Sequence, residues 1–226
     1  QSVTLGTLSL ADNTGVASNY SLTSATLDIN AKPISLSGSK VYDASATAAS
    51  SALTISGTVG GQTLTLSGNG TLSAGADAGT NKTINTSGLT LSDGSGGTAG
   101  VATNYSLVGG TYQMTVTQRP VTISGSRFYD STTTVSSSDI STFTNTTGGQ
   151  TLSITGSGTV ATAIAGSGKT VALGNLTLAD GTGSASNYSL ASGTFDINSR
   201  QVNITGSRVY DGTTTVNGSD LVITTG

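Results

Sequence analysis

Asn187-Tyr188-Ser189-Leu190, followed about 22 residues later by Tyr210-Asp211, is the last of three copies of one pattern, and this pattern organises the whole chain. The earlier copies are Asn104-Tyr105-Ser106-Leu107 with Tyr129-Asp130, and Asn19-Tyr20-Ser21-Leu22 with Tyr42-Asp43. Successive Tyr-Asp pairs are 87 and 81 residues apart. This spacing predicts a tandem array of one small module.

Further motifs keep the same register. Gly60-Gly61-Gln62-Thr63-Leu64 returns as Gly148-Gly149-Gln150-Thr151-Leu152, which is 88 residues later. The register predicts the C-terminal part of a repeat at residues 1–31, full repeats at 32–118 and 119–199, and the N-terminal part of a repeat at 200–226. We therefore expect the chain to be a piece of a longer array.

The local pattern has a period of two residues, as in Val121-Thr122-Ile123-Ser124 and Leu152-Ser153-Ile154-Thr155. Such alternation of apolar residues and hydroxyls is typical of half-buried strands, and Gly-Gly, Asp-Gly and Ser-Gly pairs between them indicate tight turns. In the second repeat we expect strands near residues 121–128, 132–136, 140–145, 150–160, 168–179 and 187–198. Residues 44–52 are the only local helix candidate, and we expect one helical turn there at most.

These elements predict an all-β fold class. About six or seven strands per repeat suit a small antiparallel module, either an Ig-like sandwich or a β-grasp-like sheet, and the alternative architecture is a β-solenoid. Modules this small bury little surface, so neighbours are expected to stabilise one another. Short linkers predict modules arranged end to end as a semi-rigid rod that bends at residues 117–119 and 198–201.

The composition argues against catalysis. The chain contains no Cys, His, Trp or Glu, and all 11 acidic residues are Asp. Neither a Ser-His-Asp nor a Cys-His site is available, so we expect no enzyme. A net charge of −3 provides no cationic patch, which argues against nucleic acid as a partner, and no apolar stretch predicts membrane insertion.

The repeated tyrosines and aspartates are expected to be structural. A Tyr that recurs once per module usually packs its ring in a core or corner and bonds its hydroxyl to the backbone, and Asp commonly closes turns. The alternative for the rings is stacking on sugars. Because Ala44, Ser131 and Gly212 follow the three Tyr-Asp pairs, a left-handed glycine is not expected to be required there. The repeat-signature residues are Tyr20, Tyr42, Asp43, Tyr105, Tyr129, Asp130, Tyr188, Tyr210 and Asp211.

Calcium is the only cofactor that the sequence brings into consideration. Asp12, Asp93 and Asp180 begin polar loops that could collect oxygen ligands, but none of these loops has the spacing of an EF-hand or a β-roll nonapeptide. We therefore expect no cofactor and keep these three residues as calcium candidates.

Ser207-Arg208-Val209-Tyr210-Asp211-Gly212-Thr213-Thr214-Thr215, its counterpart at residues 126–134 and the Asn-Tyr-Ser-Leu copies resemble the YDG repeat. That repeat is related to the mostly bacterial Ig-like repeats of very large surface proteins, and the resemblance extends over the whole chain. It implies a filamentous-haemagglutinin-like adhesin, exported by two-partner secretion or as an autotransporter, and located outside the cell or on the bacterial surface. No catalytic residue is implied.

Two functional hypotheses remain. In the first, the repeats form the stalk or filament of an adhesin that serves surface attachment, cell aggregation or the biofilm matrix. Its partners, extracellular polysaccharide or a host or neighbouring cell surface, are then contacted through the parent protein. In the second, the repeats bind extracellular polysaccharide directly through many weak sites. Self-association is a further option, because edge strands with little charge are poorly protected against pairing.

Overall fold

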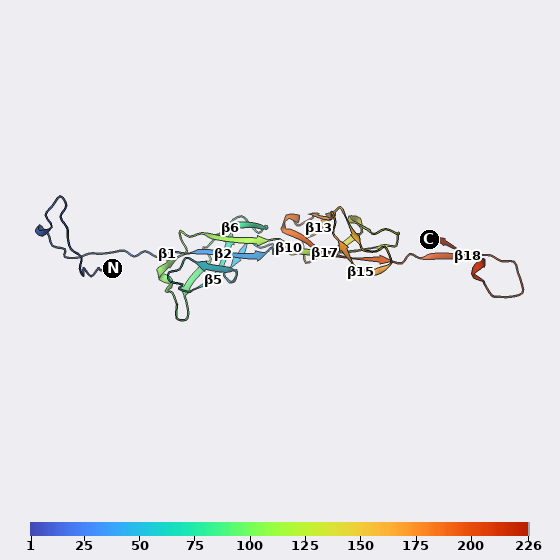
Figure 1. Cartoon of the computed structure of the whole chain (residues 1–226), viewed down its shortest axis with the longest axis horizontal. Coiled ribbons are helices and arrows are strands. Elements are labelled where there is room, and N and C mark those ends of the chain that lie inside the picture. Colours follow the sequence, from blue (N-terminus) through green and yellow to red (C-terminus); the bar gives the residue numbers. More distant parts are fainter. Residues whose placement is uncertain (226) are drawn as a thin grey trace. The chain divides into compact units, whose positions relative to one another are not determined.

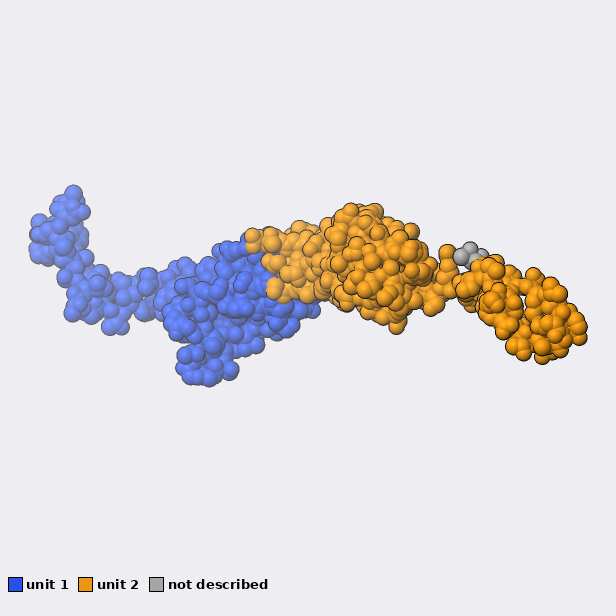
Figure 2. Space-filling model, turned by 45° about the vertical axis from the view of Figure 1, so that its right-hand side comes forward, with its two compact units in different colours: residues 1–38, 47–72, 83–114 blue, residues 39–46, 73–82, 115–226 orange. Residues whose placement is uncertain are grey.

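The computed structural model describes residues 1–225, so the predicted segment 200–226 ends one residue outside the described part. The chain divides into two compact units, coloured separately in Figure 2. The first unit comprises residues 1–38, 47–72 and 83–114, and the second comprises 39–46, 73–82 and the chain from 115 onward. Three short segments of the predicted first repeat, 39–46, 73–82 and 115–118, thus belong to the second unit.

The first repeat is built from nine short strands, three of which (β2, β6 and β9) have one end in the second unit. They are β1 (Lys32–Pro33), β2 (Ser35–Val41), β3 (Thr47–Ala49), β4 (Leu53–Ser56), β5 (Leu64–Leu72), β6 (Gly79–Asn85), β7 (Leu89–Asp93), β8 (Tyr105–Ser106) and β9 (Tyr112–Thr117). The sheet has the order β3-β5-β6-β9-β2-β4, and β7 pairs with the first half of β5.

The second repeat has the same strand order, which is β11-β14-β15-β17-β10-β12. Its strands are β10 (Arg119–Phe128), β11 (Thr134–Ser136), β12 (Ile140–Thr144), β13 (Leu152–Thr155), β14 (Ser157–Val160), β15 (Gly166–Ala172), β16 (Thr177–Asp180) and β17 (Tyr188–Asn198). Of the following repeat, β18 (Val202–Gly206) and β19 (Leu221–Thr225) form one hairpin. The all-β fold of similar modules predicted from the sequence is therefore confirmed.

In the second repeat (Figure 1) the first strand, β10, and the last, β17, run parallel to each other, and the other pairs are antiparallel. In the first repeat β1 runs parallel to β8. Arg119 of β10 is the register partner of Tyr188 of β17, and Lys32 of β1 is that of Tyr105 of β8. Parallel pairing needs a long connection, and here most of the repeat lies between the two strands. The module is thus mixed rather than purely antiparallel, and its strand order is not that of a β-solenoid.

The core of the second unit forms where the alternating strands turn their apolar residues inward. Arg127 covers this core, with its guanidinium 5.5 Å from the centre of the Phe195 ring. The buried cluster consists of Ile123, Val135, Val160, Val171, Leu176, Phe195 and Ile197. In the first unit the buried side chains include Ile34, Leu36, Ala48, Leu72, Ile84, Leu89 and Met114.

The expected strand at 150–160 is divided at Gly156. This glycine has φ = 86°, and a Cβ there would overlap the carbonyl oxygen of Asn175. The break lets β13 pair with β16 while β14 pairs with β11 and β15. The expected strand at 168–179 is likewise divided, between β15 and β16. Both segments were predicted as one continuous strand, and this was wrong. The alternation of apolar and polar residues continues through each segment although the pairing partner changes, so the sequence pattern does not mark the break.

Helical structure is limited to short 3₁₀ turns in the described part of the chain. One of them, Ser50–Ala52, lies where at most one turn was expected, and Ser137–Asp139 is its counterpart in the second repeat. Within residues 1–225 no helix is both long enough and apolar enough to cross a membrane.

Candidate functional site at a joint between repeats

A hydrogen-bonded corner forms where the Asn-Tyr motif meets the Gly-Gly-Gln motif. In the second repeat the Tyr188 hydroxyl donates to Gln150 Oε1 at 2.5 Å and accepts from the Thr147 amide at 3.3 Å. In the first repeat the Tyr105 hydroxyl donates to Gln62 Oε1, also at 2.5 Å, and accepts from the amide of Val59. Both rings are buried. The two motifs that repeat in the sequence are therefore the two halves of one corner.

Tyr42, which directly follows β2 of the first repeat, packs on this corner of the second repeat. Its ring meets the Tyr188 ring edge-on, with centroids 5.4 Å apart and an interplanar angle of 80°. Gln150 Nε2 donates to the Tyr42 hydroxyl at 3.0 Å, so the Gln150 amide forms hydrogen bonds with the hydroxyls of both tyrosines. Tyr42 is only 3% exposed. Edge-on aromatic pairs stabilise by about 0.5–1.5 kcal/mol beyond the area that they bury.

Asn187 makes a second contact to the first repeat, at the loop before β6. Its Oδ1 accepts from the amide of Ala78 at 2.7 Å, and its Nδ2 donates to Asp77 Oδ1 at 2.8 Å. Lys82 supports the loop, since its Nζ donates to the carbonyl of Asp77 at 2.5 Å. Asn187 is 2% exposed, and among the described residues Asn187 and Lys82 are the two buried polar ones. Both belong to this contact.

Arg119 completes the arrangement from β10. Its Nη1 donates to the carbonyl of Tyr42 at 3.3 Å, while Nε and Nη2 donate to the main-chain and side-chain oxygens of Asn145 at 2.7 and 2.9 Å. All these groups lie in the second compact unit. We call the set the joint, which consists of Tyr42, Asp77, Ala78, Arg119, Gln150, Asn187 and Tyr188.

The joint is chemically suited to holding two repeats together. Its buried polar groups are paired with one another, and burial of such groups is favourable only when they are paired. Its side chains are two tyrosine rings, the amides of Gln150 and Asn187, one guanidinium and one carboxylate. None of them is a nucleophile activated by an adjacent base. The arrangement fixes the geometry of the contact between the two repeats.

Each Tyr-Asp pair ends in the same turn. Asp43 Oδ1 accepts from the Ser45 amide at 3.0 Å, and Asp130 and Asp211 accept from the amide two residues on at the same distance. The residue after each Asp is left-handed, with φ of 62° at Ala44, 65° at Ser131 and 78° at Gly212. Glycine is therefore not required at this position, as expected, since Ala44 and Ser131 occupy it, but the left-handed conformation is common to all three turns. The turn requires positive φ, which glycine adopts without strain and Ala44 and Ser131 adopt at a cost.

A family model for the YDG domain matches the chain at residues 28–116 and again at 112–195, and these ranges contain the first two Tyr-Asp turns and both corners. The chain belongs to the YDG domain family. No curated protein and no solved structure was found to match the chain. The two matches place one YDG repeat directly after another.

The aspartates of the YDG turns are held in their charged form. Partial burial raises the pKa of Asp43, but the hydrogen bonds from Lys40 and Ser45 and the charge of Lys40 outweigh it, and the pKa lies below the usual value. The hydrogen bond from the Thr132 amide lowers the pKa of Asp130, and that from the Thr213 amide lowers the pKa of Asp211. Lys40, Arg127 and Arg208 each form an ion pair with the Asp three residues later.

The calcium candidates close loops of the YDG repeats. Asp93 and Asp180 each accept from the amide of an alanine that begins a 3₁₀ turn, namely Ala102 and Ala185, at 2.7 Å. Asp12 accepts in the same way from Ala17, at 2.5 Å. Within residues 1–225 no group of three acidic side chains is placed to hold a metal ion. Each candidate thus has a hydrogen-bonding role in its own loop.

The signature tyrosines differ in exposure although their motifs are alike. Tyr42, Tyr105 and Tyr188 are buried, whereas Tyr20, Tyr129 and Tyr210 are 68%, 42% and 88% exposed. Asn104 and Asn19, the counterparts of Asn187, are also exposed. A signature tyrosine is therefore buried only where other residues of the described chain pack against its ring.

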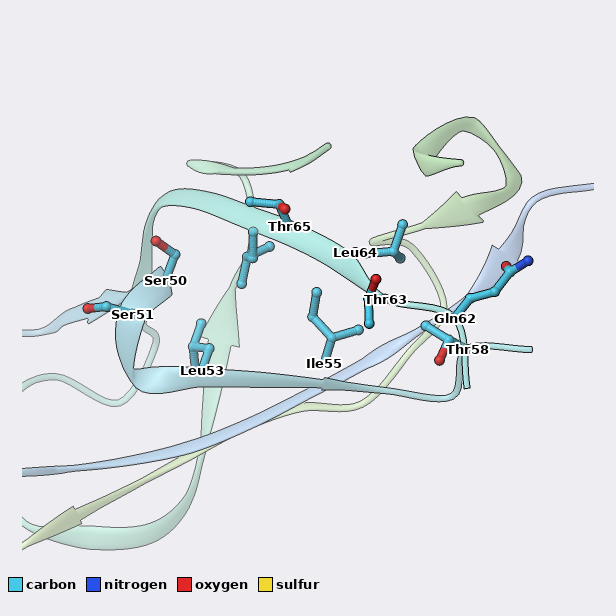
Figure 3. A pocket seen from close by; sticks show the side chains of 10 residues that line it. Ser50, Ser51, Leu53, Ile55, Thr58, Gln62, Thr63, Leu64 and Thr65 are labelled. Atoms are coloured by element: carbon cyan, nitrogen blue, oxygen red, sulfur yellow. The ribbon is translucent and has the colours of Figure 1, made fainter. Parts of the chain in front are cut away.

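An open groove lies on the first unit between β4 and the start of β5 (Figure 3). Its volume is about 490 Å³, and Leu53 and Ile55 of β4 lie opposite Leu64 and Thr65 of β5. Ser50, Ser51 and Thr58 add hydroxyls, and no lining residue is charged or aromatic. The groove offers hydrogen bonds and apolar contact but no ring on which a sugar could stack.

Sequence reasoning did not identify Asp77, Gln150 or Asn187 as site residues. Gln150 carried a signal, because its Gly-Gly-Gln motif repeats, and Asn187 lies in the Asn-Tyr motif. Asp77 carried none, since its counterpart in the second repeat is Ile164. Repetition marks what a module needs for itself, and a contact made only once leaves no such mark.

Proposed function

We propose that this chain is part of the structural repeat region, a stalk or filament, of a large secreted bacterial adhesin of the filamentous-haemagglutinin-like type. The observation that carries the proposal is the joint, in which Tyr42 and Asp77 of one YDG repeat are held by Gln150, Asn187 and Tyr188 of the next. A purely flexible linker would need no buried contacts between repeats.

A spacer benefits from such a joint for a physical reason. Repeats that share buried, paired polar groups can bend only by breaking them, so an array of them resists bending and local unfolding. We propose that the repeats follow one another as a semi-rigid rod at the cell surface, and that adhesion, aggregation or attachment to the biofilm matrix is carried out through the parent protein. The role is non-catalytic.

Direct binding of extracellular polysaccharide by the repeats is the second candidate. It is favoured by the groove of the first unit, whose hydroxyls and apolar floor suit a weak saccharide contact. Against it stands the absence of aromatic and charged side chains from the groove lining. Any affinity of one groove would therefore be low, and the array would have to multiply it.

Co-sedimentation of the folded chain with extracellular polysaccharide and with whole cells, with and without calcium, tests the proposal. A spacer predicts no saturable binding under either condition. Saturable binding that is lost in Thr65→Met, which fills the groove from an exposed position without adding an aromatic ring, would instead assign polysaccharide binding to the repeats. Circular dichroism of both proteins controls for folding.

A further inference from the structure

The second repeat presents an open pocket of about 690 Å³ beside its own Tyr-Asp turn. Tyr129 and Ile164 line the pocket, and they are 42% and 69% exposed. Ala165 and Arg200 lie in the same lining. An aromatic ring, an aliphatic side chain and a guanidinium are thus left without a cover at this end of the repeat.

Each of these residues is the counterpart of one that the first repeat contributes to the joint, or that receives it. Tyr129 lies 87 residues after Tyr42 in the repeat register. The other pairs, in the same register or in that of the following repeat, are Ile164 with Asp77, Ala165 with Ala78, and Arg200 with Arg119.

The backbone around the pocket is already arranged as in the joint. The amide of Tyr129 donates to the carbonyl of Asn198 at 2.9 Å, as the amide of Tyr42 donates to that of Thr117 at 2.9 Å. Tyr42 is nevertheless 3% exposed and Tyr129 is 42% exposed. Tyr42 is covered by the Asn-Tyr corner of the following repeat, whereas within residues 1–225 no such corner lies against Tyr129.

We propose that this pocket is a socket for the Asn-Tyr corner of a further YDG repeat, in a chain that carries one. The tyrosine of that corner packs edge-on against Tyr129, its glutamine bonds the Tyr129 hydroxyl, and its asparagine accepts from the Ala165 amide. Arg200 donates to the carbonyl of Tyr129, as Arg119 does to that of Tyr42.

Ile164 makes this second joint chemically different from the first. Asp77 supplies a carboxylate to Asn187 Nδ2, whereas Ile164 offers only apolar contact. The socket therefore keeps the main-chain donor and loses the charge-assisted bond. Ile164→Asp is expected to tighten the docking, because hydrogen bonds to charged groups are stronger than those between neutral groups.

The inference rests on the proposed spacer function in so far as the occupant is another YDG repeat. The two remain separable. Binding of polysaccharide would refute the spacer function but would not affect the proposed docking of a further repeat. If a further repeat does not dock at the Tyr129 pocket, the docking proposal is refuted, and the array can still act as a flexible spacer.

The test extends the full chain after its last residue with residues 146–199, which completes a third repeat in register. Nitration of the tyrosines, mapped by peptide mass, measures their exposure before and after the extension. We expect Tyr129 to lose its reactivity and reach the low level of Tyr42, while Tyr210, which gains no following repeat, stays reactive. The added tyrosine equivalent to Tyr188 reports folding of the third repeat, since it becomes buried when it forms the corner with the glutamine of its own repeat. In the chain with Ile164→Asp, Tyr129 should be protected further.

A second measurement uses the chain unchanged. The corner of the first repeat, formed by Gln62, Asn104 and Tyr105, is offered in trans by adding unlabelled chain to isotopically labelled chain up to about 1 mM, the effective concentration of a short tether. Saturable shifts of the Tyr129 and Ala165 signals support the socket. Unchanged reactivity of Tyr129 beside a folded third repeat overturns the proposal, as does the absence of shifts in trans if the added residues do not fold.

Discussion

Asn187 Nδ2 donates to Asp77 Oδ1 at 2.8 Å across 110 residues of sequence, and the same amide accepts from the backbone beside Asp77. One side chain of the second YDG repeat thus uses both ends of its amide to hold a loop of the first. These bonds link side-chain and main-chain groups of two successive repeats, and their contribution to stability can be measured.

Removal of the Asn187 amide should weaken the second unit. Asn187→Ala leaves the amide of Ala78 and the carboxylate of Asp77 without their partner, and we expect a loss of about 1–3 kcal/mol in unfolding free energy. Asn104→Ala, at the exposed counterpart, should change it by less than about 0.5 kcal/mol. Urea unfolding of both variants checks this. Equal effects would show that the asparagine serves its own repeat and not the joint.

The Tyr42 ring should matter far more than the ring of its exposed counterpart. Tyr42→Ala removes a buried aromatic side chain and is expected to cost about 3 kcal/mol. Tyr210→Ala, at an 88% exposed position, should be close to neutral. Thermal unfolding, followed by circular dichroism, measures both. A large loss in Tyr210→Ala would contradict the view that burial follows from the neighbouring repeat.

Glycine should stabilise the Tyr-Asp turn that lacks it. Ala44 has φ = 62°, which costs roughly 1–2 kcal/mol for a residue with a Cβ. After the entropic cost of glycine, Ala44→Gly should raise stability by about 0.5–1 kcal/mol. Ala74→Gly serves as the control at an exposed position without positive φ, and it should lower stability. If both substitutions destabilise to the same extent, the turn is not strained.

The glycine at the strand break should resist substitution. Gly156→Ala places a Cβ at φ = 86° and against the Asn175 carbonyl oxygen, so we expect a loss of at least about 2 kcal/mol. Gly97→Ala, where a Cβ has open space and φ is not positive, should be nearly neutral in comparison. Chemical unfolding compares the two. A tolerated Gly156→Ala would mean that β13 and β14 can form one continuous strand.

Acid should destabilise the YDG turns. The pKa values of Asp43, Asp130 and Asp211 lie below the usual range in the folded chain. Their contribution to stability is therefore complete above the unfolded pKa of about 3.9 and is lost as the pH falls through the lower folded values. Unfolding free energies between pH 7 and pH 2.5 measure the loss. Replacement of the three residues by Asn, which keeps an oxygen acceptor, should flatten the decline; an unchanged slope would assign it to other carboxylates.

Local sequence was sufficient for the fold class. The alternation in Val121-Thr122-Ile123-Ser124 depends only on which face of a strand each side chain occupies, so it can be read without knowledge of any partner. The repeat register could be read from Tyr-Asp and Asn-Tyr for the same reason. The sequence marked both residues of the corner, because Gln150 and Tyr188 lie in repeated motifs, but it did not show that they contact each other.

Pairing and burial were decided by the tertiary structure. The parallel pairing of β10 with β17, the change of partners at Gly156 and the contact of Asn187 with Asp77 join segments that no local pattern relates. Tyr42 and Tyr129 occupy the same motif, yet only Tyr42 is buried, because a side chain loses water only where another surface covers it. A motif specifies the residue, and the neighbouring repeat determines what that residue does.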